Sequence, residues 1–158
     1  EVDVLGLGMW VAPEQAKDFG VFFSPRRHPP ELAFFLQKPP AGRIRELADA
    51  FGAAWAGLDD AGMRTLAGHA DLVVQASSAG MGEGSGDPVP GHRFSGREIA
   101  YDLVYSPRET AFLSRARAAG CTVVPGIRML LEQARGQFRL FTGRDIPPDL
   151  LNDLEQEL

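Results

Sequence analysis

The sequence is short of several residue types, and each shortage excludes a class of protein. It has one cysteine in 158 residues, so an internal disulfide and a metal site built from cysteines are excluded. No stretch of about 18 consecutive apolar residues occurs, so we expect no transmembrane helix and no membrane partner. The formal net charge is −5, and such a field repels phosphate backbones, so we expect no nucleic-acid partner.

The start of the chain lacks the features of a targeting segment. No basic leader followed by an apolar core is present, so secretion is not indicated and we expect a cytoplasmic protein. The first residue is Glu1 rather than methionine, which indicates a piece of a longer chain. The three histidines stand far apart, without an acid or a cysteine at ligand spacing, so no metal site is expected.

Short apolar runs alternate with amphipathic segments along the chain. The runs predict buried strands, at 32–36, 71–76, 98–105 and 121–124. The amphipathic segments predict helices, at 43–51, 59–67, 108–119 and 127–141, with a short final helix at 149–157. Such alternation implies βαβ units, so we expect an α/β fold of three layers with a mostly parallel sheet.

Two other segments are rich in proline or glycine. Residues 13–31 contain Pro13, Pro25, Pro29 and Pro30, and proline biases its predecessor away from helix. We therefore expect one or two helical turns there at most. Residues 77–96 are rich in glycine and predict a long loop, which in folded domains is usually functional or mobile.

The helix expected at 127–141 carries two neighbouring stripes. The first is apolar and is expected to pack on the sheet; it consists of Ile127, Leu130, Leu131, Ala134, Phe138 and Phe141. The second is neutral and mostly polar; it consists of Gly126, Met129, Gln133, Gln137 and Leu140. A neutral stripe beside a core face suits the wall of a cleft, but it also suits a subunit contact or a lightly charged surface.

Three motifs resemble those of the shikimate dehydrogenase family, in the family's order and spacing. Residues 75–81, QASSAGM, resemble its N-A-T-S-A-G-M. Residues 101–110, YDLVYSPRET, resemble its Y-D-x-x-Y-x-P-x-x-T. Residues 126–134, GIRMLLEQA, resemble its G-L-G-M-L-x-x-Q-A, and the likeness continues to Gly143.

The resemblance implies a Rossmann-like domain that binds NADP. In the family, this domain closes on a separate N-terminal domain that holds shikimate, and a hydride moves between NADPH and the carbonyl of 3-dehydroshikimate. This step belongs to the shikimate pathway, which leads to chorismate and the aromatic amino acids. The implied division is a divergent segment at 1–37, derived from the linker and first βα unit, the NADP-binding domain at 38–146 and a C-terminal helix at 147–158.

The resemblance also assigns roles to residues of the last two motifs. Gly126 matches the glycine whose backbone holds the nicotinamide amide, and Leu103 and Met129 match positions beside the nicotinamide ring. Gln133 and Tyr105 match residues that contact the substrate. Simpler readings stay open: Met129 as a core methionine, Gln133 as a solvated amide, and Tyr105 with its hydroxyl in water.

Two cations precede the first motif. Lys38 and Arg43 lie where the family has N-R-T-x-x-R, whose arginines bind the 2′-phosphate of NADP. Pro39 replaces the first arginine, while Arg43 keeps the register of the second. No acid follows the strand to accept a ribose hydroxyl, so NADP is favoured over NAD. The alternative is that both cations are ordinary solvated charges.

The N-terminal part departs from the family pattern. The phosphate loop G-A-G-G is missing, since residues 9–31 contain a single glycine, Gly20, and no pair of glycines. Asp3 and Gly6 match the end of N-T-D-x-x-G, whose aspartate is half of the catalytic Lys–Asp pair, but Asp3 also reads as an ordinary charge. Neither lysine of the chain, Lys17 or Lys38, has the surroundings of the catalytic lysine.

Two hypotheses follow for the function. The first is an enzyme: the nucleotide-binding portion of a shikimate-dehydrogenase-like NADP oxidoreductase, which alone is expected to have little or no activity. The second is a degenerate, non-catalytic Rossmann-like module that serves binding or assembly. Titration with NADPH distinguishes them, because the second predicts no binding.

Overall fold

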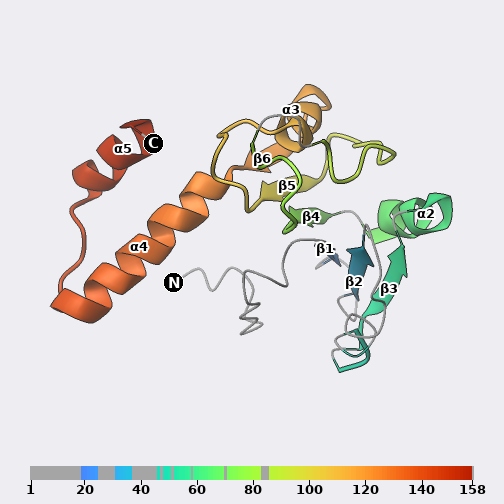
Figure 1. Cartoon of the computed structure of the whole chain (residues 1–158), viewed down its shortest axis with the longest axis horizontal. Helices are drawn as coiled ribbons and strands as arrows, with labels where there is room; N and C mark the ends of the chain where they lie inside the picture. Colours follow the sequence, from blue (N-terminus) through green and yellow to red (C-terminus); the bar gives the residue numbers. More distant parts are fainter. Residues whose placement is uncertain are drawn as a thin grey trace.

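The computed structural model of the chain describes residues 19–24, 31–36, 46, 48–50, 52–57, 59–69, 71–82 and 86–157. Strands and helices alternate through most of this part (Figure 1). In chain order the elements are β1 (Phe19–Ser24), β2 (Glu31–Leu36), β3 (Ala54–Gly57), α2 (Asp60–His69), β4 (Leu72–Gln75), β5 (Ile99–Asp102), α3 (Ala111–Ala118), β6 (Thr122–Val124), α4 (Gly126–Thr142) and α5 (Pro148–Glu157).

All six strands belong to one sheet, in the order β3-β2-β1-β4-β5-β6. The pairs β2–β3, β4–β5 and β5–β6 are parallel, whereas β1 is antiparallel to both of its neighbours, β2 and β4. Five strands therefore share one direction, and their C-terminal ends meet at one edge, which we call the carboxyl edge. The predicted α/β fold with a mostly parallel sheet is confirmed.

Strand β1 corrects the prediction for the proline-rich segment. Residues 19–24, FGVFFS, form a strand in a region where only helical turns were expected. Aromatic and β-branched residues favour strands, and pairing on both sides supplies the backbone hydrogen bonds. Neither β1 (FGVFFS) nor β2 (ELAFFL) contains a proline, so every residue of both strands has a backbone N–H for pairing.

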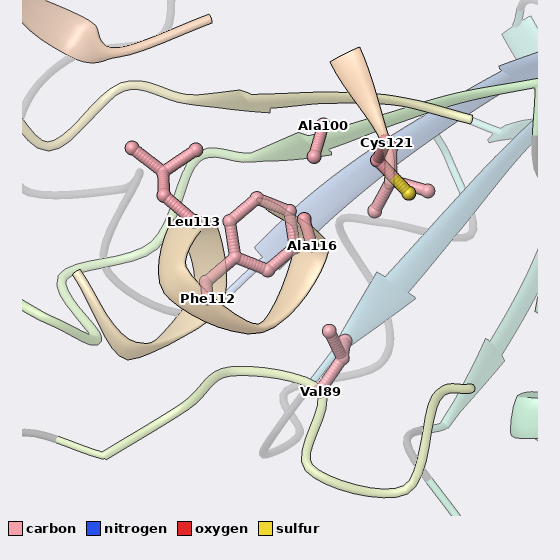
Figure 2. Close-up of a cluster of buried hydrophobic side chains, with 7 residues drawn as sticks. Val89, Ala100, Phe112, Leu113, Ala116 and Cys121 are labelled. Atoms are coloured by element: carbon pink, nitrogen blue, oxygen red, sulfur yellow. The ribbon is translucent and has the colours of Figure 1, made fainter. Parts of the chain in front are cut away.

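The core lies between α3 and the strands β4, β5 and β6. Figure 2 shows Phe112 and Ala116 of α3 on the side of the helix that faces Ala100 of β5 and Cys121, and Leu113 of the same helix belongs to the same buried cluster. Phe112, Leu113 and Ala116 are at most 1% exposed. Burial raises the pKa of the Cys121 thiol, which fits a small buried side chain rather than a nucleophile.

Thr110 and Gly120 mark the two ends of α3. At its start, the Thr110 hydroxyl accepts a hydrogen bond from the backbone N–H of Leu113 at 3.2 Å, which is an N-cap. At its end, Gly120 has a φ of +89°, a conformation in which a side chain is strained. Gly120 therefore ends the helix close to the end of the range predicted from the sequence.

Helix α4 corrects the prediction that its whole apolar stripe packs on the sheet. Ile127 and Leu131 are 1% and 8% exposed, but Phe138 and Phe141 are 39% and 82% exposed. Figure 1 shows the reason: α4 runs on beyond the end of the sheet, so only its first turns reach the core. No helix in the described ranges is long and apolar enough to cross a membrane.

Arg115 of α3 fastens the segment that precedes β5. Its guanidinium donates to the carbonyl oxygens of Val89 at 2.7 Å, His92 at 2.9 Å and Pro90 at 3.0 Å. Its Nε lies 2.6 Å from Oδ2 of Asp87. Part of the long loop expected at 77–96 is thus tied to the core by one side chain.

Glu98 is a buried carboxylate at the start of β5. It accepts hydrogen bonds from the backbone N–H of Ser95 at 2.8 Å, from the Ser95 hydroxyl at 3.0 Å and from the thiol of Cys121 at 3.4 Å. Burial alone would raise the pKa of Glu98, but these donors outweigh it and lower the pKa from 4.5 to about 2. The ionised form therefore stabilises the fold.

We expect Glu98→Gln to lower the free energy of unfolding by about 2–3 kcal/mol at neutral pH, because the donors lose their charged acceptor. A lowered folded-state pKa contributes stability that is complete above about pH 4.5 and lost as pH falls toward about 2. The difference in the free energy of unfolding between the variant and the parent should therefore shrink as the pH is lowered through this window. Urea unfolding at several pH values measures it, with the exposed Glu109→Gln as control; a constant gap would contradict the assignment.

Candidate functional site

The first part of the site is the loop that follows β4. Gln75, the last residue of β4, is 2% exposed. Its amide nitrogen donates to the carbonyl oxygens of Ala79 at 2.7 Å and Ser77 at 3.2 Å, and its amide oxygen accepts from the Ser77 N–H and hydroxyl at 3.0 and 2.9 Å. One buried amide thus sets the path of the QASSAGM segment at the carboxyl edge.

The second part is the loop that follows β5. Asp102 is fully buried, and it accepts from the Thr110 hydroxyl at 2.6 Å and from the Val104 N–H at 2.9 Å. Burial raises the pKa of Asp102 from 3.8 to about 6, against the effect of these two hydrogen bonds. Asp102 therefore closes the loop 103–109 and connects it to the N-cap of α3, which is a structural role.

The two loops meet at Gly80. Its φ is +92°, and an added Cβ would lie 3.1 Å from Cγ2 of Thr110. This close approach joins the loop after β4 to the cap of α3, so both loops are held by one set of contacts around Thr110.

The third part is the N-terminus of α4, which crosses the loop after β5 at very short range. A Cβ on Gly126 would lie 2.5 Å from the carbonyl oxygen of Val104 and 2.8 Å from the carbonyl carbon of Leu103. Only a glycine permits such an approach between two backbones. The structure thereby places the backbone of Gly126 directly against the backbones of Leu103 and Val104.

The remaining site candidates of the last two motifs lie along the same surface. Met129 stands one turn beyond Gly126 and is half-buried, and Gln133 follows one turn later and is exposed. Tyr105 is 46% exposed, next to the Val104 contact. Of the five candidates, which we call the wall, Tyr105 and Gln133 are thus exposed, Leu103 and Met129 are half-buried, and Gly126 is buried against the loop after β5.

Arg128 distinguishes this wall from the family pattern. It stands where the pattern G-L-G-M-L has its second glycine. Its Nε lies 3.3 Å from Oε1 of Glu155, so the first turn of α4 is linked to α5. Both side chains are partly exposed, and such a pair contributes little to stability.

Three predicted site residues, Asp3, Lys38 and Arg43, lie outside the described residues. Within the part that the structure describes, no cluster of three histidine, cysteine or acidic side chains could hold a metal ion. Gln75 and Thr110 shape the two loops but were not among the site residues predicted from the sequence. The signal for Thr110 was its position at the end of the second motif.

Comparisons with known proteins agree with this geometry. A family model described as the shikimate 5'-dehydrogenase C-terminal domain matches residues 126–152. Curated shikimate dehydrogenases (NADP(+)) from Halorubrum lacusprofundi and Moorella thermoacetica are 45% and 43% identical over 113 and 101 residues, which are 71% and 63% of this chain. The matches cover 40% and 34% of those proteins, so the chain spans well under half of their length.

Solved structures give the same result. Shikimate 5-dehydrogenase from Thermus thermophilus, in complex with NADP(H) and shikimate, is 32% identical with a TM-score of 0.63, over 78% of this chain and 45% of that one. Quinate dehydrogenase from Corynebacterium glutamicum, in complex with NAD, is 33% identical with a TM-score of 0.59, over 71% and 40%. The motifs, the fold and these likenesses agree, and the chain belongs to the shikimate dehydrogenase family.

Proposed function

We propose that this chain is the nucleotide-binding portion of an NADP-dependent oxidoreductase that interconverts 3-dehydroshikimate and shikimate in aromatic amino-acid biosynthesis. The observation that carries the proposal is the contact of Gly126 with Leu103 and Val104 at the carboxyl edge. It fixes the backbone of Leu103 and Val104 against the first turn of α4, which also carries Met129. The residues that the family resemblance assigns to the nicotinamide ring are thereby held close together.

The nicotinamide end of NADP fits this wall. Gly126 would hold the ring amide through its backbone, while Leu103 and Met129 would flank the ring. When bound, the cofactor supplies the hydride chemistry, and the chain supplies alignment. Lys38 and Arg43 stay our candidates for the 2′-phosphate, since a guanidinium forks onto phosphate oxygens.

The substrate side of the site requires a partner. Tyr105 and Gln133 are exposed and would contact a shikimate-like substrate from one side. The last turns of α4 also expose Leu140 and Phe141, at 81% and 82%. An apolar surface of this kind marks an interaction site. We propose that a substrate-binding domain covers it and supplies the acid–base chemistry, with Asp3 as the candidate from this chain.

A chimera tests this function. The region of the Halorubrum lacusprofundi protein that matches this chain over 113 residues would be replaced by the corresponding residues of this chain. We expect the chimera to reduce NADP with shikimate, and the isolated chain to show little or no turnover. A folded chimera without turnover would contradict the proposal.

The same proposal places the protein in the cytoplasm, where NADPH is available.

Within the chimera, we expect Gln133→Ala to raise the KM for shikimate by roughly tenfold, because one hydrogen bond to a substrate hydroxyl is worth about 1–1.5 kcal/mol. The KM for NADP should stay unchanged. Gln137→Ala, one turn further along the exposed stripe of α4, is the matched control and should alter neither constant. An equal loss for both ligands in Gln133→Ala would contradict its assignment to the substrate.

One observation favours the second candidate, a non-catalytic module. The first strand of the sheet is reversed, and the segment around it has no phosphate loop. A degenerate module should bind neither NADPH nor a nicotinamide mononucleotide. Calorimetric titration at millimolar ligand separates it from the enzyme, which should bind both.

A further inference from the structure

Strand β1 has the place of the first strand of a dinucleotide-binding sheet but the opposite direction. The order β3-β2-β1-β4-β5-β6 is that of the doubly wound nucleotide-binding fold, in which these strands are parallel. Here β1 is antiparallel to β2 and β4. Gly20 pairs with Gln75 and Phe19 with Leu36, so β1 begins, rather than ends, at the carboxyl edge.

This reversal removes the structural basis of a pyrophosphate site. In the doubly wound fold, the pyrophosphate is bound by the N-terminus of the helix that follows the first strand at the carboxyl edge. In this chain β1 ends at Ser24, which pairs with Glu31 at the opposite edge of the sheet. Six residues, 25–30, connect them, whereas a crossover with a helix needs at least about 10–12.

The described residues around this position offer no substitute. A pyrophosphate without helix N–H groups would need arginine or lysine. Strands β1, β2 and β3 contain neither, and neither does the segment 71–82, which holds β4 and its loop. The described arginines nearest along the carboxyl edge are Arg108 and Arg128, which lie beyond β5 on the nicotinamide side.

We infer that the site holds the cofactor by its nicotinamide end: the nicotinamide wall takes the nicotinamide ribose phosphate, and the described residues of the carboxyl edge provide no anchor for the pyrophosphate bridge. This inference rests on the proposed function, because it assumes that the wall of Leu103, Gly126 and Met129 receives the ring. It predicts that adding adenosine monophosphate to the ligand gains almost no affinity.

Titration of the 158-residue chain with reduced nicotinamide mononucleotide and with NADH tests the inference, because NADH adds the pyrophosphate bridge and adenosine without the 2′-phosphate. We expect the two dissociation constants to agree within about threefold. NADH binding roughly thirtyfold tighter or more would overturn the inference and leave the proposed function intact. Binding of neither ligand at millimolar concentration would overturn both.

Met129→Ala provides an independent readout on the same two ligands. If both are held by the nicotinamide wall alone, the variant should weaken both by the same factor. A loss confined to the mononucleotide, with NADH binding unchanged, would show that NADH is held away from the wall and would overturn the inference. Thermal unfolding of the variant, matched to the parent, establishes that the half-buried Met129 has been removed without loss of the fold.

Discussion

Replacing Gly126 by valine should reduce the affinity for reduced nicotinamide mononucleotide by more than roughly a hundredfold and lower the free energy of unfolding by about 1–3 kcal/mol. The cause is steric. An added Cβ would meet the Val104 carbonyl oxygen at 2.5 Å and its carbonyl carbon at 2.6 Å, both of them backbone atoms that cannot rotate away. The start of α4 would have to move off the loop after β5, and the wall would be lost.

Gly136→Ala in the same helix is the matched control. Nothing lies within 4 Å of the position that its Cβ would take. Glycine in a helix interior costs about 0.5–1 kcal/mol relative to alanine, so this change should stabilise the protein and leave binding unaltered. Titration and thermal unfolding measure both effects. Unchanged binding in Gly126→Val would exclude the crossing of Gly126 and Val104 as part of the site.

Arg115→Ala should be strongly destabilising although it lies outside the site, with a loss of about 3–5 kcal/mol. It would remove three hydrogen bonds to backbone carbonyls, the ion pair with Asp87 and a cation–π contact in which the guanidinium carbon lies 5.3 Å from the Phe94 ring centre. The carbonyls and the carboxylate would remain in place without their partner. Such a loss is a large share of the about 5–15 kcal/mol that domains possess.

Arg117→Ala, two residues further along α3, serves as the control. Arg117 pairs with Glu109 at 3.1 Å, but their side chains are 59% and 47% exposed. Exposed pairs contribute about 0–1 kcal/mol, so this variant should unfold close to the parent. Chemical denaturation measures the loss in the free energy of unfolding for both variants. Similar losses for the two would contradict the role of Arg115 in fastening the segment before β5.

The sequence predicted the central and C-terminal parts of the fold well, for a physical reason. The segments 111–118 and 126–142 combine a clear apolar period with strong end signals, Gly120 after the first and Pro125 before the second. Each local preference there agrees with the packing in the sheet and the core. The ranges predicted for these elements therefore differ from the observed ones mainly at the ends. After β5, for example, the apolar run continues to residue 105, but the paired strand ends at Asp102.

Two features could not be predicted because they depend on distant contacts. The direction of β1 is set by pairing with β2 and β4, and no local pattern states whether a strand runs parallel or antiparallel. Phe141 is exposed because α4 is longer than the part of the helix that the sheet covers. Its spacing from the other apolar residues of α4 is nevertheless that of a buried stripe. Periodicity assigns a residue to a face, but it does not tell what covers that face.

The site divides in the same way. Motifs that are contiguous in sequence already indicated the candidate binding residues, which are Leu103, Tyr105, Gly126, Met129 and Gln133. Gln75 and Thr110 could not be assigned in this way, because their roles are hydrogen bonds to loop atoms that only the folded backbone brings within reach. Sequence motifs thus indicated the residues that would face a ligand, and the structure identified those that hold them in place.

The central claim is that the wall beside Gly126 receives a nicotinamide ring. The most direct measurement is a nuclear Overhauser experiment on the chain with labelled methionine methyl groups and bound reduced nicotinamide mononucleotide. We expect a cross-peak between the ring protons and the Met129 methyl, and we expect that cross-peak to disappear in Gly126→Val. A bound ligand whose ring protons contact another methionine, and never Met129, would contradict the claim.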